Sequence, residues 1–192
     1  MAQFKGDSYI GGSLGVAKNV NIGNKASGLI VTPEYPILIS APRGGSYFSD
    51  TASVTGAIRI RLPTYNKTHQ IKFKVSIFDA TNDQCLELWI SGVTASFWLN
   101  TTAILLTSVA ARALSVRFGY FVDGGTNYNA VYIGEVSSTW AYPNARVHDV
   151  LVGSRNLPAE DEYIQNWSIA MATSLGTISV TETATPPIAK WG

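Results

Sequence analysis

The sequence predicts an all-β protein, a jelly-roll-like β-sandwich preceded by a short fibrous β segment. Apolar and polar residues alternate in many short runs, turns rich in Gly, Asn, Asp and Pro separate these runs, and capped amphipathic helical segments are almost absent. About nine strands are expected between residues 53 and 182, which is enough for two packed sheets. A chain of 192 residues can bury a core without disulfides or metals.

The predicted strands and turns are clearest in the middle of the chain. HQIKFKVSIFD (69–79) places an apolar residue at every second position, which is typical of a strand with one buried face. GAIRIRLP (56–63) and ALSVRFGYF (113–121) repeat the pattern. DATNDQ (79–84) and VDGGTNY (122–128) predict hairpin turns, because Asp-Gly and Gly-Gly accept the positive φ that such turns need.

Two segments depart from this pattern. TTAILLTSVAARALSV (101–116) is apolar throughout, and a helical turn near residues 107–112 is the best helix candidate. Residues 1–45 are rich in Gly and Asn with isolated Val and Ile, and such thin strands become stable by wrapping around equivalent strands. We therefore expect a stalk end with linker strands over 1–45 and the sandwich head over 46–192. A loosely ordered leader is the alternative for the first segment.

Charge and cysteine usage narrow the classes of partner. A net charge of +1 gives no basic footprint for nucleic acid or an anionic membrane, and no apolar stretch is long enough to span a bilayer. Charged residues make up only 14% of the chain, which favours burial of surface in an oligomer. The single Cys85 has no partner for an internal disulfide and is expected to be buried.

Catalytic and metal motifs are weak, so the sequence predicts a protein without enzymatic activity or cofactor. GGSLG (11–15) matches a nucleophile pattern but lacks the strand before it and the helix after it. His69 and His148 lack metal-ligand spacing, and the side chains of His148 and Asp149 are expected on opposite faces of a strand. PAEDEY (158–163) is interpreted as a solvated acidic turn.

Aromatic residues suit either a core or a sugar-binding surface. They make up 11% of the chain, with five Trp and nine Tyr. Sugar rings stack on aromatic faces while amides, hydroxyls and carboxylates bind sugar hydroxyls, but large rings also fill cores. The core is favoured for Trp167 and Trp140. The candidate receptor contacts, mostly in loops, are Tyr65, Asn66, Asn82, Asp83, Asn127, Tyr128, Trp140, Tyr142, Glu160 and Asp161.

Three segments carry a family resemblance. SVTGAIRIRLP (53–63), VRFGYFVDG…AVYIGEVSSTWAYPNARVHDVLVG (116–153) and WSIAMATSLGTISVT (167–181) occur in this order. In these segments and their order, the chain resembles the C-terminal head domain of tail fibre proteins of tailed phages and prophages over about residues 45–181. Residues 88–114, the segment before Trp167 and the tail after residue 181 depart from the pattern.

The resemblance implies a homotrimeric fibre tip without catalytic residues. The protein would be made in the bacterial cytoplasm, join the rest of the tail fibre of a virion or related contractile particle, and bind a bacterial surface glycan or an outer-membrane protein. Two alternatives stay open: a module that only caps and registers the trimer, and a polysaccharide-degrading tip. The latter would need a pair of carboxylates, and the sequence singles out none.

Overall fold

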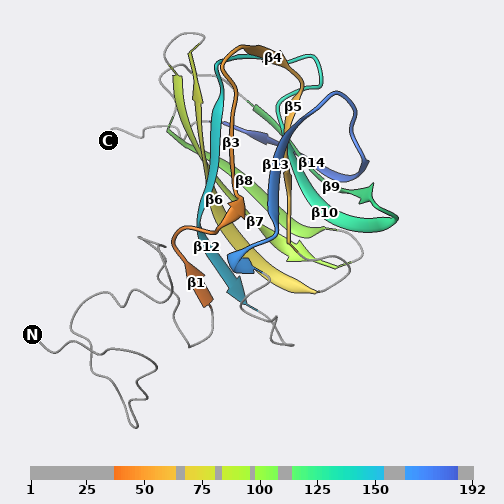
Figure 1. The fold of residues 1–192 in the computed structure, drawn as a ribbon. Helices are drawn as coiled ribbons and strands as arrows, with labels where there is room; N and C mark the ends of the chain where they lie inside the picture. The colour runs from red at the N-terminus through yellow and green to blue at the C-terminus, as the bar shows by residue number, and fades with distance from the viewer. Residues whose placement is uncertain are drawn as a thin grey trace, which may run out of the picture.

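The computed structural model describes residues 37–63, 68–80, 84–95, 98–107, 114–153 and 163–185, which form an all-β body (Figure 1). Its strands are β1 (Ile37–Ile39), β2 (Gly44–Gly45), β3 (Tyr47–Ser49), β4 (Ser53–Thr55), β5 (Ala57–Arg61), β6 (His69–Asp79), β7 (Gln84–Thr94), β8 (Leu99–Thr107), β9 (Leu114–Asp123), β10 (Thr126–Ile133), β11 (Thr139–Ala141), β12 (Asn144–Gly153), β13 (Trp167–Ala172) and β14 (Thr177–Ala184).

Two six-stranded sheets make up most of the body. Sheet A has the order β1-β12-β6-β7-β8, with β3 also paired to β12. Sheet B has the order β14-β9-β10-β5-β13-β2, and β4 pairs with β11 in a small third sheet. The β13–β2 pair is parallel, and the other ladders of the described residues are antiparallel. The all-β, multi-sheet architecture expected from the sequence is thus confirmed.

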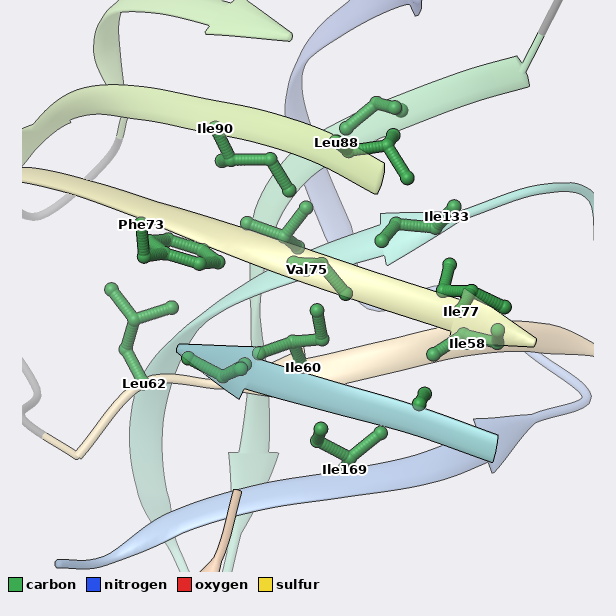
Figure 2. Packing of buried hydrophobic residues seen from close by; sticks show 14 of the residues in the cluster. Ile58, Ile60, Leu62, Phe73, Val75, Ile77, Leu88, Ile90, Ile133 and Ile169 are labelled. Carbon is green, nitrogen blue, oxygen red and sulfur yellow. The ribbon is translucent and has the colours of Figure 1, made fainter. Parts of the chain in front are cut away.

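One core lies between the inner faces of sheets A and B. Figure 2 shows Phe73, Val75 and Ile77 of β6 beside Ile58 and Ile60 of β5, and all five side chains are fully buried. Each such side chain contributes about 1.5–3 kcal/mol when it leaves water. The alternation of β6 therefore decides which face of sheet A is turned towards sheet B.

Three buried tryptophans complete this core, and each indole N–H is satisfied by a backbone carbonyl. Trp98 donates to the oxygen of Gly119 at 3.0 Å, and Trp140 donates to that of Gly56 at 2.9 Å. Trp167 donates to a neighbouring carbonyl at 2.8 Å. The core role favoured by the sequence for Trp140 and Trp167 is confirmed.

The predicted hairpin turn at 122–128 is confirmed. Of the turn predicted at 79–84, residues 81–83 lie outside the described residues, and the pairing of the flanking strands fits a hairpin. Strands β6 and β7 pair down to Asp79 opposite Gln84. Strands β9 and β10 are joined by Gly124 and Gly125, whose φ angles are 58° and 81°. Positive φ at both central residues is the geometry that lets a two-residue turn follow the twist of the strands.

The strand count and the environment of the cysteine differ from the sequence predictions. The described residues between Ser53 and Ala184 form eleven strands, not about nine, because β4 and β11 are too short to show a pattern. Cys85 is exposed rather than buried, because the inward positions of β7 begin at Leu86.

Other expectations fall partly outside the described residues. The helical turn predicted near residues 107–112 lies outside the described residues, except for Thr107. Thr107 is the last residue of strand β8. Most of the predicted stalk, residues 1–36, lies outside as well. Strands β1 and β2 of that segment pair with β12 and β13. Within the described residues, no helix is long and apolar enough to cross a membrane.

The contact between β9 and β14 gives a test of the fold. A Cβ at Gly119 would overlap the backbone carbonyl of Thr177, so Gly119→Ala is expected to lower the free energy of unfolding by about 1–3 kcal/mol. Gly124→Asn is the control, because nothing lies within 4 Å of a Cβ there and Asn accepts positive φ. Urea denaturation measures both variants. Equal losses of stability would contradict this packing.

Candidate functional site: the outer face of sheet A

The outer face of sheet A consists of the side chains of β3, β6, β7, β8 and β12 that point away from the core. Strand β6 is central and is paired along its length with β12 on one side and β7 on the other. Its backbone polar groups are therefore used in the two ladders, and the side chains determine what the face can bind. The outward residues of β6 are Gln70, Lys72, Lys74, Ser76 and Phe78.

Three exposed aromatic residues lie near one end of this face: Tyr47 and Phe78 on its strands, and Tyr142 in the turn that leads into β12. The exposed fractions of Tyr47, Phe78 and Tyr142 are 54%, 55% and 57%. Asn144 lies among them: its Oδ1 accepts from the Tyr47 hydroxyl at 2.8 Å, and its Nδ2 donates to the Tyr142 carbonyl at 3.2 Å. Phe78 stands directly opposite Asn144 in the β6–β12 ladder. We call these four residues the aromatic patch.

Backbone contacts fix the turn that presents Tyr142. Tyr142 has a φ of 49°, a conformation that needs support from its surroundings when the residue is not glycine. The preceding Ala141 N–H donates to Asp79 Oδ1 at 2.9 Å, and its carbonyl accepts from Ala80 N–H at 2.8 Å. The turn is therefore tied to the end of β6, which also carries Phe78.

A chain of polar contacts occupies the middle of the face. Ser76 Oγ lies 2.8 Å from His148 Nε2, and His148 Nδ1 lies 3.3 Å from Asp149 Oδ2. Lys74 Nζ lies 3.1 Å from the same Asp149 oxygen and 3.5 Å from Glu87 Oε1. The hydrogen bond to Asp149 is the largest cause that raises the pKa of Lys74 above its ordinary value. We call these five residues the polar network.

The contact between His148 and Asp149 corrects the expectation that their side chains point to opposite faces. The register between β12 and β6 shifts between His148 and Leu151, and Asp149 has a φ of 49°. Such an irregularity inserts an extra residue into one strand and re-aims its side chain. Period-two alternation fails at this point of β12 for that reason.

The order of Ser76, His148 and Asp149 matches the order of nucleophile, base and orienting carboxylate in a hydrolytic triad. Acyl transfer also needs donors aimed at the developing oxyanion. Ser76 lies in mid-strand, paired with Arg146 on one side and Glu87 on the other, where backbone N–H groups serve the ladders. We therefore interpret the polar network as a support that holds side chains on the face.

A groove of about 340 Å³ opens at the other end of the face. Its residues are Gln70, Ile71, Lys72, Ser91, Gly92, Val93, Asn100, Leu151 and Gly153. Beside it, Lys72 Nζ lies 3.4 Å from the centre of the Trp89 ring. The groove therefore offers amides, a hydroxyl and one cation over a partly apolar floor.

The structure brings few of the sequence-predicted contact residues together. Tyr142 belongs to the aromatic patch, whereas Trp140 is fully buried and presents no ring for a sugar. Asn127 and Tyr128 lie on β10 of sheet B, where the Tyr128 ring packs 4.5 Å from the Arg61 guanidinium carbon. Those outside the described residues are Tyr65, Asn66, Asn82, Asp83, Glu160 and Asp161.

Sequence reasoning missed most of the patch and the groove. Tyr47, Phe78 and Asn144 were not expected as contacts, nor was Trp89. One signal was available: Phe78 is apolar but stands at an outward, polar position in the alternation of β6. A large apolar residue at such a position is a candidate for a binding surface.

Comparison with known proteins identifies no relative. No family model, no curated protein and no solved structure matches the chain significantly. In the part of the chain that the structure describes, no group of three or more His, Cys, Asp or Glu residues could hold a metal ion.

The polar network predicts how one lysine titrates. Asp149→Asn removes the carboxylate that contributes most to the raised pKa of Lys74, so this pKa is expected to fall towards 10.5. Asn also accepts the positive φ of this position. Glu87→Gln is expected to lower the pKa less, because Glu87 contributes less. NMR titration of the lysine ¹³Cε measures both, and a larger effect of Glu87→Gln would contradict the network.

Proposed function

We propose that the protein binds a bacterial surface glycan through the outer face of sheet A, without catalysis. The aromatic patch carries this proposal, because it combines three exposed aromatic residues with an amide that two hydrogen bonds hold in place. The C–H faces of sugars stack on such rings, and an amide can bind sugar hydroxyls. Fixing these groups before the ligand arrives lowers the entropic cost of binding.

We further propose that the protein is the tip of a tail fibre of a phage or phage-like contractile particle. The resemblance over about residues 45–181 supports this assignment. In this proposal the head is a jelly roll, residues 1–45 end the stalk, and three chains form a trimer on the rest of the fibre. An outer-membrane protein is the alternative receptor, and a polysaccharide-degrading tip is the alternative activity.

A second candidate function is a module that only caps and registers the fibre trimer. Exposed apolar side chains on the edge strands of sheet A favour it, since another chain could cover them. They are Leu38 of β1 and Leu99 and Ile104 of β8. This candidate requires a trimer but no glycan, so the two experiments below separate it from the first.

The assembly is tested by light scattering coupled to size exclusion. We expect a mass of three times the 20.6 kDa of one chain, because low charge and apolar edges favour burial between copies. A single-chain mass that persists across protein concentrations would contradict the fibre-tip proposal. The glycan proposal would still stand for a separate β-sandwich.

Glycan binding is tested with aromatic substitutions. Tyr142→Ala and Phe78→Ala are each expected to weaken binding to host surface polysaccharide about tenfold, or about 1.4 kcal/mol, because each removes a stacking ring. Val122→Ala is the control, as Val122 is equally exposed but lies on β9 of sheet B. Biolayer interferometry on immobilised polysaccharide measures all three. Unchanged affinity in both aromatic variants would contradict glycan binding by this face.

A further inference from the structure

We infer that the glycan accepted by this face is acidic, with carboxylate groups that meet two cations on either side of the polar network. The inference rests on the proposed glycan-binding function and adds the chemical class of the ligand. It follows from the charges of the outer face of sheet A.

The positively charged side chains of this face are not all paired with carboxylates. Its cations are Lys72, Lys74 and Arg146, and the polar network supplies two carboxylates, Glu87 and Asp149. Both carboxylates are engaged by Lys74. Among the described residues, neither Lys72 nor Arg146 lies within ion-pair distance of a carboxylate. As far as the described residues go, two cations are therefore left for an external anion.

Each of these cations lies beside a surface that can hold a sugar ring. Arg146 stands opposite Tyr47 of the aromatic patch in the β12–β3 ladder. Lys72 lines the groove together with Gln70 and Asn100. Arg146 is also opposite Ser76, which lies four residues along β6 from Lys72. The backbone positions of the two cations are therefore about 13 Å apart along the strand direction. One oligosaccharide can therefore reach both.

The Trp89 ring holds the Lys72 ammonium at the face. A cation 3.4 Å from the ring centre is attracted by the negative π face, which limits the conformations of the lysine. The groove beside it carries amides and a hydroxyl but no carboxylate among its lining residues. A singly charged carboxylate matches this single cation and its neutral hydrogen-bonding partners.

The test compares an acidic oligosaccharide with its neutral ester on the full chain. The probes are hexagalacturonate and fully methyl-esterified hexagalacturonate, measured by calorimetry at low ionic strength. We expect at least tenfold tighter binding of the acid. Lys72→Met and Arg146→Met are each expected to reduce this preference, the ratio of the affinities for acid and ester, at least threefold. Methionine keeps much of the side-chain length.

Arg43→Gln is the matched control for charge. Arg43 is exposed, lies next to β2 of sheet B and carries the same charge, so its loss should leave the preference unchanged. Thermal unfolding verifies that all three variants are folded. An equal effect of Arg43→Gln would show that net charge, not this face, attracts the acid, and would overturn the inference.

Three further outcomes decide between the inference and the function on which it rests. Equal affinity for acid and ester overturns the acidic class but leaves glycan binding in place. Binding of dextran sulfate as tight as that of hexagalacturonate overturns the assignment to carboxylates. Binding of neither hexasaccharide also overturns the inference, whereas the glycan proposal fails only if the patch variants keep full affinity for host polysaccharide.

Discussion

The pairing of β6 with two neighbours is the constraint on which the rest of the structure depends. Its ladder with β7 runs without a shift from His69 to Asp79. A slip of one residue would turn Phe73 and its apolar neighbours to solvent and bring lysines into the core. The cost of burying charge fixes the register, and the register fixes the order of side chains across the outer face of sheet A.

The irregularity in β12 shows how a local break in this regular pairing brings polar side chains together. Strand β12 follows β6 from Asn144 to His148 and then shifts. In an unbroken strand, His148 and Asp149 would point to opposite faces. His148 already faces outward opposite Lys74, and the shift turns Asp149 to the same face, so the Asp149 contacts of the polar network depend on the interruption of the ladder.

The sequence predicts features that are decided locally and misses those that depend on a partner strand. The alternation of β6 and the Gly124–Gly125 turn are local, and both are confirmed. The irregularity of β12 is defined by its register with β6, so the sequence of β12 alone does not reveal it. The aromatic patch unites Tyr47, Phe78 and Tyr142, which are far apart in the chain, so no motif search could group them. Short strands such as β4 have no periodicity to detect.

The exposed cysteine allows this surface to be labelled at a single position. Cys85 is the single cysteine of the chain and stands directly opposite Phe78 in the β6–β7 ladder, at the border of the aromatic patch. A maleimide dye or spin label would therefore attach at one known place and report on occupancy of the neighbouring rings. Oxidation of the same thiol to an intermolecular disulfide would link two molecules at the border of the patch. Preparations for binding measurements accordingly need a reductant.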